Sequence, residues 1–153
     1  MSTALRWMTV ADIESVEAAR DVFDYEVRTE WAQRFLEDPN HHLCFAYKDE
    51  ELAGMITGVE ITHPDKGTEM FLYELGVAAR FRSSGIGKAL VAALADVALE
   101  RGCYGMWVLT DANNEAALRT YQAGGATDSE ESVMLTWLLD PTHRTFGPER
   151  EST

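Results

Sequence analysis

Hydrophobic and polar positions along the chain follow two periods, and each period predicts a different kind of element. Alternating or continuous runs rich in β-branched and aromatic residues predict strands. The strands expected on this basis are Ala4 to Thr9, Leu43 to Tyr47, Leu52 to Thr62, Met70 to Val77, Tyr104 to Leu109 and Val133 to Leu139. The run from Met70 to Val77 is apolar enough to predict a central strand that is buried on both faces.

Apolar residues three and four positions apart predict four helices between these strands. The first has its apolar face at Ile13, Val16, Ala19 and Phe23, and the second carries Trp31 and Phe35 and is expected to stop before Pro39. The longest extends from Gly85 to Glu100, with Gly102 as its stop, and the last extends from Glu115 to Ala123. Polar turns are expected at Lys48 to Glu51 and His63 to Gly67.

The resulting order of elements is β-α-α-β-β-β-α-β-α-β, without an internal repeat or a linker. This order predicts one α/β domain over residues 1–153, built on a mixed, mostly antiparallel central sheet flanked by helices. A polar tail from about residue 140 is expected to add little to the core.

Composition narrows the possible partners. The chain has 26 acidic and 13 basic residues, a formal net charge of -13, which repels nucleic acid and anionic membranes and attracts polycations. The same acidity also serves solubility alone, so charge leaves a cationic substrate and simple solubility as equal alternatives. Neither a long apolar run nor a signal-type N-terminus is present, which predicts a cytoplasmic protein without a membrane partner.

Cysteines and histidines offer little chemistry of their own. The two cysteines, Cys44 and Cys103, lack C-x-x-C spacing and are expected to be buried thiols. The group His41-His42-x-Cys44 with His63 contains metal-ligand types, but neighbouring strand residues point to opposite faces and the spacing matches no zinc pattern. We therefore expect no metal site.

The most informative segment lies between the apolar strand at Met70 and the longest helix. It reads Arg82-Ser83-Ser84-Gly85-Ile86-Gly87-Lys88. Its glycines allow a tight turn and a close backbone approach to a ligand, and Ser83 or Ser84 is able to cap the helix. The free amides and positive dipole end of a helix start bind phosphate oxygens, although a glycine-containing cap without a ligand fits the spacing as well. Neither a G-x-G-x-x-G nor a P-loop pattern is present.

This segment resembles a known family. Arg82-x-x-Gly85-x-Gly87, following a strand that ends Leu75-Gly76-Val77, is similar to the pyrophosphate loop of the GNAT superfamily of acetyl-CoA-dependent N-acetyltransferases. A second stretch, Asn114-x-x-Ala117-x-x-x-Tyr121-x-x-x-Gly125, is similar to the signature of a later helix in that family, with Ala126 in place of the usual Phe. The resemblance implies the family's fold, acetyl-CoA as co-substrate and a CoA site at Leu75 to Val77, Arg82 to Lys88 and Asn114.

Within the superfamily, the stretch from Phe71 to Ala78 resembles the aminoglycoside 3-N-acetyltransferases. Glu74 takes the place of that group's aspartate and is one methylene longer. The resemblance implies that a polycationic small-molecule amine, an aminoglycoside acetylated at its 3-N position, is the acceptor, and that the protein forms a homodimer. Another amine, such as a polyamine, an amino acid or a protein terminus, and a CoA-binding module without catalysis are the alternatives.

Acetyl transfer needs a base, an oxyanion site and an acid, and the sequence offers a candidate for each. A carboxylate in an apolar strand is costly unless it is paired or faces a cavity, so Glu74 is either a structural ion-pair partner or a base with a raised pKa. Tyr121 is an ordinary amphipathic helix residue or, as the resemblance implies, the acid for the CoA thiolate. Backbone amides near Leu75 and Val77 are expected to polarise the thioester. Asn114 is a coenzyme contact or an ordinary N-cap.

The acceptor site is the part of the prediction with the fewest sequence signals. In the family the first two helices and their connection line it, and here that region holds Asp24, Tyr25, Glu26 and Glu30. Several carboxylates beside one cleft suit a substrate with several amines, whereas a solvated acidic helix face explains each residue equally well.

Overall fold

Five strands form one sheet, in the order β1-β2-β3-β4-β5, in the computed structural model, which describes residues 2–143. The first four strands pair antiparallel, and β5 pairs parallel to β4. This arrangement confirms the predicted mixed, mostly antiparallel sheet. The strands are β1 (Thr3–Trp7), β2 (His41–Lys48), β3 (Glu51–His63), β4 (Gly67–Val77) and β5 (Gly105–Trp107).

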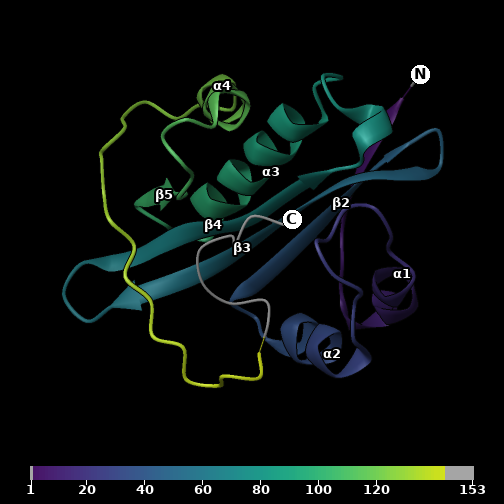
Figure 1. Cartoon of the computed structure of the whole chain (residues 1–153), viewed down its shortest axis with the longest axis horizontal. Coiled ribbons are helices and arrows are strands. Elements are labelled where there is room, and N and C mark those ends of the chain that lie inside the picture. The colour runs from purple at the N-terminus through teal and green to yellow at the C-terminus, as the bar shows by residue number, and fades with distance from the viewer. Residues whose placement is uncertain (1, 144–153) are drawn as a thin grey trace.

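Helices cover both faces of the sheet, as Figure 1 shows: α3 and α4 lie on one side, and α1 and α2 lie on the other. Their bounds are α1 (Ile13–Glu17), α2 (Thr29–Glu37), α3 (Ile86–Glu100) and α4 (Glu115–Ala123), with short 3-10 turns η1 (Val10–Asp12) and η2 (Ala79–Phe81). Within residues 2–143, each helix is too short or too polar to cross a lipid bilayer.

The core beneath α3 follows from the helical period of its sequence. Ile86, Leu90 and Leu94 recur every four residues, are fully buried, and pack with Ile56 of β3 and Leu72 of β4. Burying a large aliphatic side chain contributes about 1.5–3 kcal/mol, so this stripe fixes α3 on the sheet. The start of α3 is thereby held at the end of β4, where the candidate site lies.

A second core fills the opposite face of the sheet. Phe45 of β2 and Met55 of β3 are buried there under Val16, Val22 and Ala32, which come from α1, α2 and the segment between them. This core covers β2 and β3. It anchors the α1–α2 segment close to the end of β4.

The first helix is shorter than the sequence predicted. The expected helix reached Phe23, but α1 ends at Glu17. The Arg20 guanidinium donates hydrogen bonds to the carbonyls of Glu17 (3.0 Å) and Ala19 (2.9 Å), and Asp21 has a left-handed φ of 67°. Because these contacts end the helix, the following residues run as a loop back to the sheet.

The prediction that β4 is buried on both faces is wrong for its second half. Met70 and Leu72 are buried, but the Tyr73 side chain is 61% exposed. A bulge causes the change: Gly58 pairs with Leu72 while Thr57 pairs with Glu74, so Tyr73 is an extra residue on β4. A bulge of this kind bends its strand and redirects the side chains that follow.

The predicted strand from Val133 to Leu139 is not formed. This segment has no regular secondary structure, and its side chains are exposed, with Val133 at 84% and Leu139 at 89%. A strand requires a neighbouring strand for its backbone groups, and among the described residues no strand pairs with this segment. The prediction for the polar tail falls partly on residues 144–153, which lie outside the described part of the chain.

Both cysteines are free thiols, as predicted. Cys44 is fully buried, and this burial raises the pKa of its thiol to about 11. Cys103 is partly buried. A thiol with a raised pKa is largely protonated at neutral pH and therefore a poor nucleophile.

Candidate active site

A cleft of about 680 Å³ opens where β4 and β5 separate. Strand β5 pairs only with the stretch Glu69–Phe71 of β4, so the later residues of β4 lack a strand on that side within the described chain. Leu75, Gly76 and Val77 line the cleft from this end of β4. The remaining walls come from the start of α3, from α4 and from the α1–α2 segment.

In the described part of the chain, no side chain forms a capping hydrogen bond with the start of α3. Gly85 is the N-cap residue, with a left-handed φ of 84°, and no atom lies within 4 Å of where its Cβ would be. The prediction of a serine cap is wrong, because the Ser84 hydroxyl donates to the carbonyl of Phe81 and Ser83 takes a left-handed φ of 61°. Among residues 2–143, no side chain therefore accepts from the first amides of α3, which leaves these amides available to an anion.

Three cationic side chains line the same cleft: Arg82, Lys88 and Arg119. Arg82 Nε donates to the Val77 carbonyl at 3.3 Å, which ties the loop to the end of β4. Six residues of the predicted coenzyme loop line the cleft and Ser84 does not; the six are Arg82, Ser83, Gly85, Ile86, Gly87 and Lys88. Positive charge beside free helix amides is the combination that binds phosphate groups.

Sequence reasoning missed Arg119, together with Asp21, Thr110 and Thr120, all of which line the cleft. Arg119 reaches Glu115 one turn earlier at 3.9 Å, and both side chains are largely exposed. The sequence signal that could have identified Arg119 is its position two residues before Tyr121 on the same predicted helix. A single basic residue on an amphipathic helix is too common to stand out.

Asn114 acts as the N-cap of α4. Its Oδ1 accepts a hydrogen bond from the Ala117 amide at 3.1 Å, which is the ordinary structural role of an asparagine at this position. Asn114 also lines the cleft. The capping role is thus observed, and the coenzyme contact stays a prediction.

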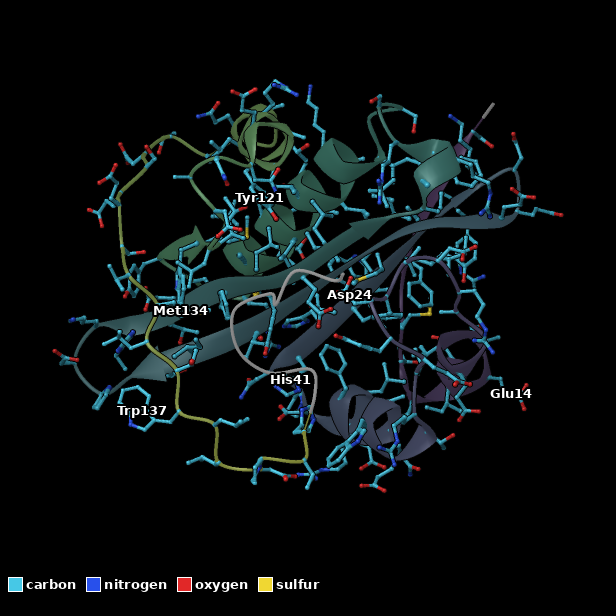
Figure 2. The ribbon with its side chains drawn as sticks, in the orientation of Figure 1. Glu14, Asp24, His41, Tyr121, Met134 and Trp137 are labelled. Atoms are coloured by element: carbon cyan, nitrogen blue, oxygen red, sulfur yellow. The ribbon has the colours of Figure 1, made fainter. Side chains whose placement is uncertain are left out.

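Tyr121 enters the cleft from α4, on the opposite side of the sheet from Asp24, as Figure 2 shows. Its ring packs against the core beneath α3. Burial raises the pKa of its hydroxyl above the ordinary value of 10.0. The hydroxyl therefore keeps its proton at neutral pH and is able to donate it.

Glu74 precedes Leu75 on β4 and is not itself one of the residues that line the cleft. Its amide donates to Thr57 Oγ1 at 3.0 Å, but within the described chain its carboxylate has no hydrogen-bond or ion-pair partner. Although the side chain is exposed by surface area, the surrounding protein atoms desolvate it and raise its pKa above 4.5, and the charge of Asp24 adds to the shift. This direction is the one predicted from the sequence for an unpaired carboxylate.

The acceptor candidates separate into two groups. Asp24 lines the main cleft and also an adjacent hollow of about 450 Å³, which Tyr25 and Glu26 line as well. Glu30 lies in the first turn of α2 and lines neither. The structure therefore brings Asp24, Tyr25 and Glu26 together and leaves Glu30 apart from them.

The histidines pair with other groups rather than with each other. His42 contacts Glu60 at 2.7 Å, His63 contacts Glu69, and the His41 ring stacks on Phe35. Within residues 2–143, no group of three or more His, Cys, Asp or Glu side chains is arranged to hold a metal ion.

The cleft thus combines an uncapped helix start, the end of a strand that has separated from its neighbour, and a partly buried tyrosine. A carboxylate with a raised pKa, Glu74, lies on the same strand. Residues 7–125 match the acetyltransferase (GNAT) family. The chain belongs to this family, which confirms the resemblance to the GNAT superfamily, while the narrower resemblance to the 3-N-acetyltransferases stays a prediction.

Similar proteins agree with this assignment. The chain is 28% identical over 109 residues to N-acetyltransferase 8 of Rattus norvegicus, a match that covers 69% of this chain and 49% of the rat protein. It spans about half the length of that relative. The family and its named relatives support an N-acetyltransferase as the kind of enzyme.

Solved structures share the fold. One is an aminoglycoside acetyltransferase from an uncultured soil metagenomic sample in complex with sisomicin, with a TM-score of 0.78, 20% identity, and 90% of this chain and 97% of that chain covered. Another is the aminoglycoside N-acetyltransferase AAC(6')-Iy in complex with CoA, with a TM-score of 0.72, 19% identity, and 89% and 95% covered. At these identities the likeness establishes the fold alone.

Proposed function

We propose that this protein transfers the acetyl group of acetyl-CoA to an amine of a polycationic small molecule, an aminoglycoside. The observation that carries the proposal is the cleft itself. Its walls include uncapped helix amides with Arg82 and Lys88, and also Asp24. Glu74, whose pKa is raised in part by the Asp24 charge, directly precedes the lining residue Leu75 on β4. A diphosphate and an ammonium would therefore be recognised at different parts of one site.

The residues at the start of α3 fit the coenzyme. The open space beside Gly85 leaves the backbone accessible, and Arg82 and Lys88 supply charge for the diphosphate. The separated end of β4, at Leu75 to Val77, would hold the pantetheine arm. Acetyl-CoA supplies the thioester whose acetyl group is transferred.

The reaction uses one proton acceptor and one proton donor from the chain. Glu74 takes a proton from the substrate ammonium, so that the neutral amine nitrogen attacks the thioester carbonyl carbon. Backbone amides at the end of β4 stabilise the oxyanion. When the C–S bond breaks, the thiolate takes a proton from Tyr121, whose raised pKa keeps it protonated until that step.

The acidic surface beside Glu74 supports a polycationic acceptor. Asp24 faces both the cleft and the adjacent hollow, where Glu26 is also present, and the whole chain has a net charge of -13. Two structures that share the fold are named as aminoglycoside acetyltransferases. The Tyr73–Val77 resemblance favours the 3-N position, and the homodimer also remains a prediction of the resemblance.

Coenzyme binding is tested first, by calorimetry with acetyl-CoA. The double variant R82A/K88A should weaken binding at least tenfold, since one hydrogen bond to a charged group contributes about 1.5–3 kcal/mol and a tenfold change in affinity corresponds to about 1.4 kcal/mol. The control is R34A, whose guanidinium lies over the Trp31 ring on α2, away from the cleft. Absence of acetyl-CoA binding by the unmodified protein would overturn the proposal.

Acceptor identity is tested by release of the CoA thiol over a panel of aminoglycosides, linear polyamines, amino acids and peptides. Turnover of aminoglycosides, with the acetylated nitrogen located by NMR, is the expected result. Turnover confined to another amine would reject the aminoglycoside assignment while leaving acetyl transfer intact. Binding of acetyl-CoA without turnover of any amine would indicate a CoA-binding module.

A further inference from the structure

Three aromatic rings, two on β4 and one on β5, form a continuous stack. The Phe71 ring stacks on Trp107 of β5 with centroids 4.3 Å apart, and on Tyr73 with centroids 5.2 Å apart. Both ends of this aromatic ladder are open, because Trp107 is 38% exposed and Tyr73 is 61% exposed. Stacked aromatic rings usually serve a core, so an open stack of three is unusual.

The aromatic ladder lies on the same face of the sheet as the candidate base. Phe71 pairs with Val59 in register, and Val59 pairs with His41, which stacks on Phe35 of α2. On the same face, Glu74 pairs with Thr57, and Thr57 pairs with Leu43 of the core beneath α1 and α2. Directly paired residues share a face. The ladder is therefore the part of this face that α1 and α2 leave open.

The order of residues along β4 sets the distance between the aromatic ladder and Glu74, the proposed base. Phe71 and Tyr73 belong to the ladder, Glu74 follows, and Leu75 begins the coenzyme side of the cleft. Strand residues advance about 3.3 Å each, so the ladder begins within about 10 Å of the Glu74 backbone. That span matches a ring system attached to an amine held at Glu74.

From this geometry we infer that the aromatic ladder is the acceptor platform, and that it selects amines carried on a six-membered ring over linear polyamines. The inference rests on the proposed function. The apolar face of a sugar or cyclohexane ring packs on the exposed rings, and flanking ammonium groups lie over their π faces. Glu74 and Asp24 take the charges that extend beyond the ladder.

Charge complementarity fits this occupant better than an apolar one. Glu69 lies two residues before Phe71, Glu74 follows Tyr73, and the chain as a whole is strongly acidic. Glu69 already contacts His63, but an apolar partner surface would have to desolvate the Glu74 carboxylate without pairing it, which is costly. A ring that carries several ammonium groups satisfies both the carboxylates and the aromatic faces.

The test compares Y73A and W107A with the unmodified enzyme on an aminoglycoside and on spermidine. Each ring removed should raise KM for the aminoglycoside about three- to tenfold. The kcat, the acetyl-CoA affinity and the KM for spermidine should stay unchanged. The control is Y104A, which removes a ring of similar exposure (57%) that does not belong to the stack. Y73F and W107F keep a ring and should restore the unmodified KM.

Two results would overturn the inference. One is an equal change of KM for both substrates. The other is an unchanged KM together with a lowered melting temperature. Either would show that the ladder only supports the fold or is covered by another part of the protein. If the unmodified protein bound no acetyl-CoA, the proposed function would fail separately. Calorimetry of aminoglycoside binding to the unmodified protein and to Y73A would then decide the ladder alone, and equal affinity would reject it.

Discussion

The carbonyl oxygen of Val22 occupies the space where a Cβ on Gly76 would lie. Val22 belongs to the α1–α2 segment and Gly76 to the end of β4, so two distant parts of the sequence meet backbone to backbone. Both residues line the cleft. This contact joins the proposed acceptor side of the cleft to its coenzyme side.

Substituting Gly76 by alanine should therefore separate the two segments. The added methyl group collides with backbone, which cannot move aside as a flexible side chain does, and overpacking of this kind costs about 1–3 kcal/mol. We expect a lower melting temperature and weaker acetyl-CoA binding. The control is G105A on β5, where a Cβ would have no atom within 4 Å. Equal stability of the two variants would contradict the contact.

The rate of acetyl transfer should rise with pH through the raised pKa of Glu74. Only the ionised carboxylate accepts a proton, and desolvation together with Asp24 moves its ionisation above pH 4.5. E74Q should lose about 100-fold in kcat/KM and lose this limb of the profile. D24N should shift the limb to lower pH, because it removes the repelling charge, whereas E30Q should leave it in place. An unchanged profile in D24N would contradict the coupling.

The same group makes a separate prediction for stability. A carboxyl whose pKa is raised on folding binds its proton more tightly in the folded state, so its destabilising effect is absent below pH 4.5 and complete above the folded-state pKa. E74Q removes this desolvated charge and should raise the melting temperature at pH 7. The difference should shrink as the pH falls toward 4. A lower melting temperature for E74Q at pH 7 would indicate that Glu74 is a structural partner.

Tyr121→Phe should separate catalysis from binding. Phenylalanine keeps the ring that packs beneath α3 but removes the proton, so kcat should fall about 100-fold while acetyl-CoA affinity stays the same. Y104F removes a hydroxyl outside the cleft and serves as the control. Steady-state kinetics and calorimetry measure the two effects. A full retention of kcat would exclude Tyr121 as the acid.

Glu60 should be a larger contributor to stability than an ordinary surface carboxylate. Its side chain is 6% exposed, accepts from Arg101 Nε at 2.9 Å, and contacts His42 Nε2 at 2.7 Å. E60Q should lower the free energy of unfolding by about 1–3 kcal/mol, since it weakens hydrogen bonds to a charged group. The control is E115Q, whose pair with Arg119 is exposed and 3.9 Å long, and which should change almost nothing. Chemical denaturation measures both.

Patterns in the sequence predicted most of the fold because they are local. The stripe of Ile86, Leu90 and Leu94 predicts a helix whatever surrounds it, and the polar pair Asp49 and Glu50 predicts the turn between β2 and β3, where both residues take a left-handed φ. The same locality explains the errors. The apolar run from Val133 to Leu139 has the composition of a strand, but composition does not supply a neighbouring strand.

What the sequence determined by itself is therefore the order of the main elements, the family, and most of the residues proposed for the site, including Tyr121 and most of the loop from Arg82 to Lys88, which line the cleft. The tertiary structure decided which groups meet. The bulge at Tyr73 depends on pairing between β3 and β4, and the meeting of Val22 with Gly76 joins residues that are far apart in the chain. Because such contacts form only once the sheet is assembled, Asp24 beside Glu74 and the stacking of Trp107 on Phe71 are properties of the fold.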